Sequence, residues 1–234
     1  ISFVDFAPTL LSLTNQKPKE YMQGQAFLGK YQSEKPRKYI YGAADRFDGE
    51  RDAIRAVRDT QFKYIRNYMP EKGYYLPITY RERIPSMKEL LILKEEGKLN
   101  DIQMQWFRES KPKEELFDCK NDPYELNNLA ENPNYQNKLA ELRNEMDRWL
   151  KEIGDNPSLP EKELVSKLWN GKEKKPKTAE PKLKIVGKKI AISCDTKGAS
   201  IGYKTNPKDI SWQIYTKPII LNPNQTLLVK SHRI

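Results

Sequence analysis

The sequence of 234 residues predicts two differently built parts: an α+β region, in which helices cover a small antiparallel sheet, and then a small all-β sandwich. Alternating apolar and polar residues mark short strands between residues 37 and 68, and residues 135–153 carry a wide apolar face at helical spacing. After a lysine-rich segment, four strand-like runs follow one another about ten residues apart, which is typical of a sandwich.

The chain opens on an apolar segment with helical spacing. Phe3, Phe6 and Leu10 lie three and four residues apart, and Asp5 stands early, beside a proline, where helices begin. The segment has no initiator Met, charged stretch or cleavage-site pattern, so it does not resemble a signal peptide. Because an apolar helix needs a partner that covers it, we expect residues 1–35 to be the last helix and loop of a larger, truncated domain.

Residues 36–170 are expected to form the α+β region. Arg37–Ala43 reads as a strand, and Ala53–Arg58 and Gln61–Tyr68 read as a hairpin. Asp45–Asp52 is polar and contains a glycine, which predicts an exposed turn between the first two strands. Four basic residues alternate along the hairpin and are expected on one sheet face: Arg55, Arg58, Lys63 and Arg66.

Four further elements complete this region. Helices are predicted at Ser86–Leu99 and Asp101–Glu109, and a short strand at Glu115–Asp118. A longer helix begins at Asn132–Pro133, where Asn is the N-cap and Pro takes the first helical position, and ends at Gly154. Its apolar face is expected to pack on the sheet, and the alternative is a docking helix for another protein.

The end of the chain changes character. Residues 171–182 are rich in Lys and Pro, which predicts a linker. Residues 183–234 are expected to form the β-sandwich, with its last turn at residues 222–224. The sequence stops at Ile234 directly after a strand-like run, so we expect this module to be cut short.

The net charge of the chain indicates which kinds of partner it is expected to bind. The chain has 42 Lys and Arg against 32 Asp and Glu, a net charge of +10, which a solvated surface accounts for most simply. Nucleic acid is not expected as a partner, because the most basic run lacks the interleaved aromatics that stack on bases, whereas a sulfated glycan suits the charge. Trp212 and Tyr215 are expected in the sandwich core rather than stacked on a sugar ring. No run approaches the roughly 20 apolar residues of a membrane span.

No residue of this chain is a candidate for catalysis. The single histidine, His232, stands near the end of the chain and is expected at the surface. Cys119 and Cys194 give no disulfide framework, and whether they pair stays open. No cluster of carboxylates has the spacing of metal ligands, so we expect no metal site here.

Several segments resemble the late part of the sulfatase family. They are FVDFAPTLL at 3–11, YMQGQAFLG at 21–29, and ELFD at 115–118 followed by NDPYELNNL at 121–129. The order and spacing of these segments extend the resemblance over residues 1 to about 170, and identify a C-terminal part similar to arylsulfatases and heparan-N-sulfatases. That family cleaves sulfate esters or sulfamates on an alkaline-phosphatase-like fold. Residues 194–203 resemble a small β module attached to chitobiases and other glycan-degrading enzymes.

The resemblance implies that the catalytic groups stand elsewhere. The nucleophile of the family is a formylglycine made from Cys or Ser in the pattern Cys/Ser-x-Pro/Ala-x-Arg, and neither Cys119 nor Cys194 lies in that pattern. We therefore expect the nucleophile and the calcium site in a missing N-terminal half of the same chain, and we expect no activity from this fragment alone. The family and its substrates imply a periplasmic or secreted enzyme that acts on a sulfated carbohydrate.

In sulfatases that resemble this chain, the turn equivalent to Asp45–Asp52 faces the active-site pocket. The candidate substrate-binding residues are Asp45, Arg46, Asp48 and Arg51. Arg46 suits a bidentate grip on sulfate or carboxylate, and Asp45 suits sugar hydroxyls; the alternative is a solvent-exposed turn with weak salt bridges. The family also implies that residues 68–85 form a long loop near the substrate. Two other functions remain open: a glycan-binding or scaffolding module, and a basic nucleic-acid-binding protein.

Overall fold

The structure, a computed structural model, describes residues 1–223 and 225–233. Asn224 of the expected last turn and Ile234 at the expected end of the module lie outside the described residues. Contacts divide the chain into two compact units after Leu159. Small antiparallel sheets and helices make up both, which confirms the expected fold class, whereas the expected four-part division of the chain stays a prediction. Within the described residues, no helix combines the length and apolar character that a membrane crossing requires.

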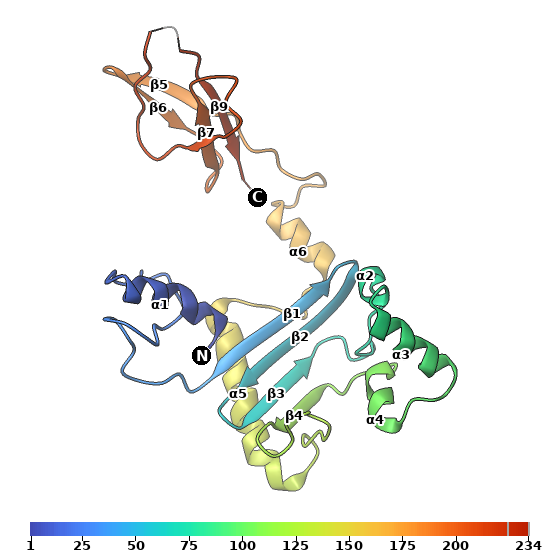
Figure 1. Cartoon of the computed structure of the whole chain (residues 1–234). Helices are drawn as coiled ribbons and strands as arrows, with labels where there is room; N and C mark the ends of the chain where they lie inside the picture. Colours follow the sequence, from blue (N-terminus) through green and yellow to red (C-terminus); the bar gives the residue numbers. More distant parts are fainter. Residues whose placement is uncertain (224, 234) are drawn as a thin grey trace. The chain divides into compact units, whose positions relative to one another are not determined.

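The first unit, Ile1–Leu159, is built on a four-stranded antiparallel sheet (Figure 1). Its strands lie side by side in chain order: β1 (Ile40–Phe47), β2 (Glu50–Arg58), β3 (Phe62–Asn67) and β4 (Glu114–Asp118). Val57, Tyr64 and Leu116 are cross-strand partners, so their side chains point to the same face, and all three are fully buried.

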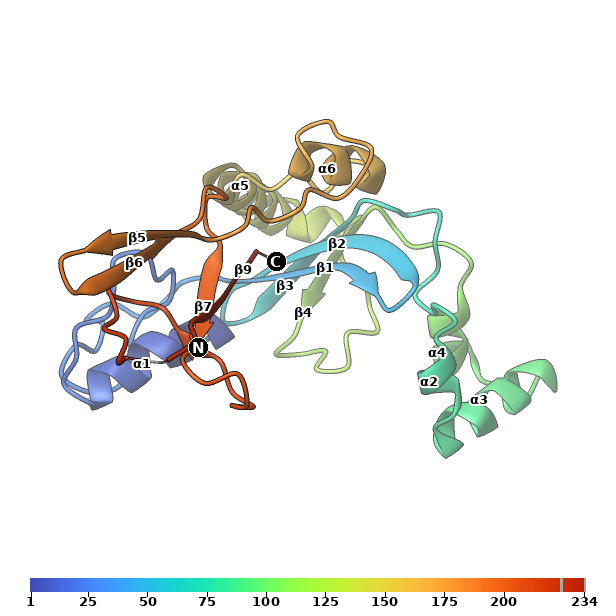
Figure 2. The ribbon, with the colours of Figure 1, turned by 90° about the horizontal axis from the view of Figure 1, so that it is seen from above.

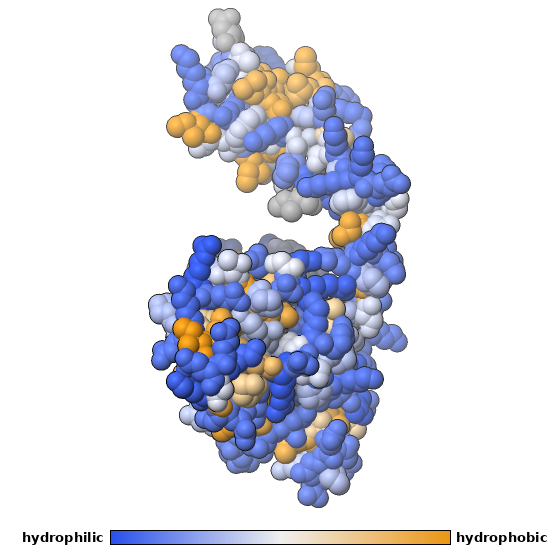
Figure 3. Space-filling view, turned by 90° about the vertical axis from the view of Figure 1, so that its right-hand side faces the viewer, coloured by the Kyte–Doolittle hydropathy of each residue, from blue (hydrophilic) through white to orange (hydrophobic). Residues whose placement is uncertain are grey.

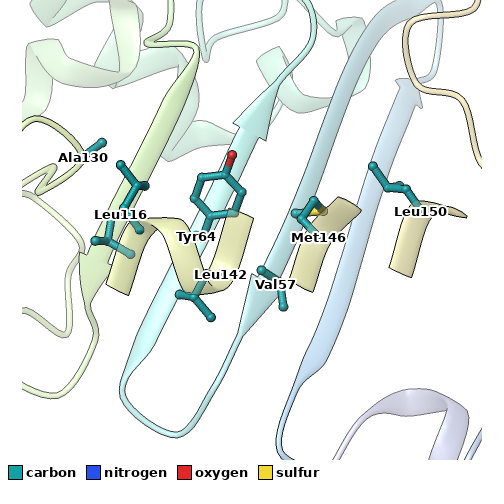
Figure 4. Packing of buried hydrophobic residues seen from close by; sticks show 8 residues of the cluster. Val57, Tyr64, Leu116, Ala130, Leu142, Met146 and Leu150 are labelled. Atoms are coloured by element: carbon teal, nitrogen blue, oxygen red, sulfur yellow. The ribbon is translucent and has the colours of Figure 1, made fainter. Parts of the chain in front are cut away.

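Helix α5 (Gln136–Ile153) covers that face, as Figure 2 shows from above. Its apolar side chains Leu139, Leu142 and Met146 are almost completely buried against the sheet residues (Figure 4). The expected end is confirmed, because Gly154 stops the helix with a φ of 68°. The start differs: the Asn132 side chain accepts a hydrogen bond from the Asn134 N–H and caps the 3-10 turn η3 (Pro133–Tyr135), and α5 follows from Gln136. Packing on the sheet, and not a free docking face, therefore accounts for the apolar stripe.

Three short helices and a 3-10 turn lie beside the sheet between β3 and β4 (Figures 1 and 2). They are α2 (Thr79–Glu82), α3 (Pro85–Glu95), α4 (Asp101–Met104) and η2 (Gln105–Phe107). Helix α3 begins one residue before the expected Ser86, because Pro85 takes the first helical position. Helix α4 begins at the expected Asp101 under an Asn100 cap, but the chain then tightens into η2 and ends at Phe107.

The N-terminal helix buries the opposite side from the one that its pattern suggests. In η1 (Phe3–Asp5) and α1 (Phe6–Leu13), four apolar side chains are half to nine-tenths exposed: Phe3, Phe6, Leu10 and Leu13. The polar residues Asp5, Thr9 and Ser12 are instead buried. The apolar side has no cover among the described residues.

A strap formed by residues 24–37 explains this inversion. The Asp5 carboxylate accepts hydrogen bonds from the Gln25 N–H and the Arg37 guanidinium, and the Ser12 hydroxyl accepts one from the Tyr31 N–H. Gly24 makes the close approach possible, because a Cβ there would lie 1.8 Å from the Val4 carbonyl oxygen. The strap thus satisfies the polar side of α1 and leaves the apolar side outward.

The second unit, Pro160–Ile234, starts with helix α6 (Glu161–Leu168) and continues in short strands. Strands β5 (Lys182–Val186) and β6 (Lys189–Ser193) form a hairpin, and β8 (Gln213–Ile214), β7 (Ser200–Lys204) and β9 (Leu228–His232) form a three-stranded sheet. Strand β5 was not expected from its sequence and begins at Lys182, the last residue of the expected linker. The Tyr215 hydroxyl accepts a hydrogen bond from the Ile192 N–H, as suits a residue inside the module.

Candidate functional site

The expected polar turn is shorter than predicted. Strands β1 and β2 continue until Phe47 pairs with Glu50, so only Asp48 and Gly49 form the loop. Asp48 adopts a φ of 56°, which a two-residue hairpin loop requires and which Asp tolerates better than most residues. The prediction of a turn over Asp45–Asp52 is therefore wrong in extent.

The four candidate residues consequently stand on two paired strands and their loop. Asp45 and Arg46 belong to β1, Arg51 belongs to β2, and Asp48 is the exposed loop residue. Arg46 and Arg51 are direct cross-strand partners, which brings two guanidinium groups to neighbouring positions. Guanidinium groups suit sulfate and carboxylate ligands, which they can bind with two parallel hydrogen bonds.

Both arginines also bind backbone oxygens of the first unit. The Arg46 Nη1 donates to the Gly49 carbonyl at 3.1 Å, across the hairpin loop. The Arg51 Nη2 donates to the Leu159 carbonyl at 2.9 Å. These contacts orient the two side chains.

Asp45 is held by a residue that the sequence did not single out as a site partner. The guanidinium of Arg55 binds both Asp45 oxygens, at 2.7 and 3.1 Å, and its Nε binds the Asp155 carboxylate at 2.6 Å. The Arg55 side chain is only 3% exposed, although 59% of the Asp45 side chain is exposed. Burial works against the Arg55 charge, yet the hydrogen bonds with Asp155 and Asp45 raise its pKa above the ordinary value. The Arg55 guanidinium thus balances the charge of the Asp45 carboxylate and fixes its position.

The pairing of β1 and β2 explains why Asp45 reaches Arg55. Ala43 is the cross-strand partner of Arg55, and Asp45 lies two residues further along β1, so it is a diagonal neighbour on the same face. The register also shifts between Ala44 and Arg46, so that Asp45 stands opposite two residues of β2, Asp52 and Ala53. The sequence offers no signal for this bulge.

A buried ion pair also involves strand β2. The Lys111 ammonium, with a fully buried side chain, lies 2.5 Å from an Asp52 oxygen. The Lys111 backbone N–H also donates to the Pro70 carbonyl, which ties the loop after β3 to the segment before β4. Asp52 lies close to the β1–β2 loop, so this pair ties the loop end of the hairpin to the segment before β4.

A cavity of about 510 Å³ lies on the sheet face away from α5. Its lining includes Ile65 and Glu115, which alternate along their strands with the core residues Tyr64 and Leu116. Other lining residues are aromatic or charged: Tyr74, Trp106, Arg108 and Tyr124. Aromatic rings beside a guanidinium and a carboxylate are groups that suit a sugar ring, and the volume admits a small molecule.

Within this cavity the Glu115 carboxylate is buried and hydrogen-bonded. The Tyr74 hydroxyl donates to one oxygen at 2.9 Å, and the Asn67 amide donates to the other at 2.6 Å. Burial and the neighbouring Glu115 raise the pKa of Tyr74. Tyr74 belongs to the expected loop of residues 68–85, which folds here as an irregular segment followed by α2.

The described residues were compared with the requirements of a metal centre and of a thiol nucleophile. Across residues 1–223 and 225–233, no three or more His, Cys, Asp or Glu side chains gather closely enough to hold a metal ion. Cys119 and Cys194 are both free thiols, and burial raises the pKa of Cys119, which disfavours its reactive thiolate. His232 is exposed on β9.

Two curated relatives match the chain, and no family model does. The chain is 64% identical over 238 residues to an ulvan-active sulfatase of Formosa agariphila, a match that covers 100% of this chain and 40% of that protein. A second ulvan-active sulfatase of the same organism is 29% identical over 160 residues, which covers 66% of this chain and 30% of that protein. The chain thus spans less than half of the length of the relatives that it matches.

Two solved structures are also similar. A candidate sulfatase from Bacteroides thetaiotaomicron has a TM-score of 0.43 at 24% identity and covers 67% of this chain and 26% of its own. A 2-O GAG sulfatase gives the same TM-score, identity and coverage.

The buried pair of Lys111 and Asp52 near the hairpin loop leads to a stability prediction. Lys111→Ala leaves the Asp52 carboxylate buried without its cation and is expected to lower the free energy of unfolding by about 3–5 kcal/mol in urea titrations. As the control, Lys98→Ala removes an exposed pair with Glu96 and should cost about 0–1 kcal/mol. Equal small losses would contradict the assigned role, whereas the combination Asp52→Asn with Lys111→Met should recover part of the loss.

Proposed function

We propose that the chain is the C-terminal portion of a sulfatase that acts on a sulfated glycan. The single observation that carries this proposal is the 64% identity to an ulvan-active sulfatase across 100% of the chain. Both curated relatives are named for ulvan, which is therefore the first substrate to test. Ester or sulfamate hydrolysis is the proposed reaction.

The reactive groups of the proposed enzyme lie outside this chain. The relatives extend over more than twice the length that the chain matches, which leaves room for a catalytic part that carries a formylglycine nucleophile and calcium. A periplasmic or secreted location is proposed, since sulfated polysaccharides are extracellular material.

We further propose that the apolar side of η1 and α1 packs against that catalytic part. Phe3 is 90% and Leu10 is 64% exposed, an arrangement that is costly in water and that a partner surface removes. The occupant is the part of the longer polypeptide that the relatives contain and that this chain does not span. The strap on the polar side supports this assignment, because it leaves only the apolar side for the contact.

The β1–β2 hairpin is proposed to read the substrate. Arg46 and Arg51 stand at paired positions and offer guanidinium donors to a sulfate or carboxylate, while Asp45 and Asp48 offer carboxylate oxygens to sugar hydroxyls. Arg55 and Asp155 hold Asp45 in place, so the group is positioned before a sugar arrives. This chain would thereby contribute binding and specificity without supplying the nucleophile.

The activity itself is tested by sulfate release. The full-length protein is expected to liberate inorganic sulfate from ulvan, and the 234-residue chain alone is expected to liberate none, since the nucleophile is assigned elsewhere. Ion chromatography of the released sulfate is the measurement, with heat-inactivated protein as the control. No release from ulvan or from any other sulfated glycan by the full-length protein would refute the proposal.

The hairpin is tested by Arg46→Ala in the full-length protein. Loss of a charge-assisted contact with the substrate is expected to raise KM about tenfold with little change in kcat, in a steady-state assay on sulfated oligosaccharides. The KM of Arg46→Lys should lie between the values for the wild-type protein and for Arg46→Ala, because a lysine keeps the charge but loses the bidentate geometry. Arg83→Ala removes an exposed arginine after α2 and serves as the control. An unchanged KM would remove Arg46 from the site.

The proposed packing of α1 is tested in two contexts. Leu10→Ser is expected to change the free energy of unfolding of the 234-residue chain by less than about 0.5 kcal/mol, because Leu10 is exposed there. In the full-length protein the same change should cost about 2–4 kcal/mol, seen as a lower thermal midpoint. Thr9→Val, which removes the acceptor of the Phe27 N–H, should destabilise both proteins. Equal behaviour of Leu10→Ser in both proteins would contradict the packing.

A further inference from the structure

The charges of the chain are divided very unevenly between its two units. The first unit contains 26 Lys and Arg and 26 Asp and Glu, so it is formally neutral. The second unit contains 16 Lys and Arg against six Asp and Glu. The whole net charge of +10 therefore belongs to residues 160–234, and a chain segment with this excess attracts polyanions.

Three side chains of this unit form a defined cluster: Trp212, Lys204 and Lys230. Gly202 on β7 leaves a gap that the Trp212 indole fills, since a Cβ on Gly202 would lie 3.4 Å from the ring. Lys204 stands two residues along the same strand, and Lys230 on β9 is the cross-strand partner of Gly202. Their ammonium nitrogens lie 5.0 and 4.1 Å from the centroid of the Trp212 ring. Both ammonium groups thus contact the same indole ring.

These two lysines have no acidic partner. Among the described residues, neither Lys204 nor Lys230 forms an ion pair with a carboxylate, and the Lys204 ammonium donates only to the backbone carbonyl of Asp209. The N–H donors of both ammonium groups are therefore incompletely used. An anion bound by both groups uses the free donors.

Another surface of the same unit is basic as well. In the β5–β6 hairpin, Lys184 pairs with Ala191 and Val186 pairs with Lys189, so Lys184 and Lys189 share one face. Both lysines are exposed. Figure 3 shows hydrophilic and hydrophobic residues side by side on the visible surface of this unit, as expected where lysines alternate with apolar residues.

We propose that the second unit is a non-catalytic binding module for a sulfated polysaccharide, with one sulfate held between Lys204 and Lys230 beside Trp212. The choice of a sulfated glycan among polyanions rests on the proposed function. The structure also disfavours single-stranded nucleic acid, because Trp212 has ammonium groups beside its ring and Tyr215 is engaged by the Ile192 N–H, so neither offers a free platform for bases. The module would keep the chain on a polymer that carries many sulfates.

The test is a binding titration of the full 234-residue chain with dextran sulfate, and with unsulfated dextran of the same length as the control. Dextran sulfate is expected to bind with an affinity that falls as salt rises, and dextran is expected not to bind. Lys204→Gln with Lys230→Gln removes both charges but keeps side chains of similar length on the indole. This variant should bind at least about tenfold more weakly, whereas Lys204→Arg with Lys230→Arg should retain binding.

The matched control is Lys172→Gln with Lys174→Gln, which removes the same charge from a stretch outside the strands. A loss of less than about twofold there supports a localised site. Equal losses in both double variants, no binding of dextran sulfate, or tighter binding of duplex DNA at the same salt would each overturn the proposal. Since no hydrolysis is measured, this result is independent of sulfate release by the full-length protein, which tests the proposed function.

Discussion

The contact between α5 and the four-stranded sheet is the constraint on which the rest of the first unit depends. Leu142 and Met146 are fully buried against Val57, Tyr64 and Leu116, and each such side chain contributes roughly 1.5–3 kcal/mol. Polar pairs around the rim, such as the one between Arg66 and Asp147, contribute about 0–1 kcal/mol each and set orientation more than stability. Because α5 ends at Gly154, Asp155 falls where it binds Arg55, and the hairpin with its candidate residues is positioned as a result.

Elements with a strong local signal could be predicted from the sequence, and α5 is the clearest case. Its Asn-Pro start, its apolar face and its glycine stop are independent signals that agree. The faces of the hairpin could not be predicted as well. Arg55 pairs with Arg66 and Arg58 pairs with Lys63, and since Arg55 and Arg58 are three residues apart they point to opposite faces, so the expectation that all four share a face is wrong. A register has to be known before alternation can assign a face.

The candidate site shows the same limit. The charges of Asp45, Arg46 and Arg51 single them out as candidates in the sequence. Their positions in strands depend on how far the pairing of β1 and β2 extends, and the composition of the segment does not predict that extent. Arg55 and Lys111 were missed as partners because both act through contacts distant in sequence, with Asp155 and with Asp52. In α1 the apolar spacing predicted the helix correctly, while the buried polar side was decided by the strap, a tertiary effect.

The equal numbers of acidic and basic groups in the first unit have a colloidal consequence. A body without net charge near neutral pH has no long-range force that keeps its copies apart, and in the 234-residue chain alone the exposed apolar side of α1 favours their association. The lysine-rich unit supplies a repulsive charge to this chain, which opposes that association as long as no polyanion neutralises it.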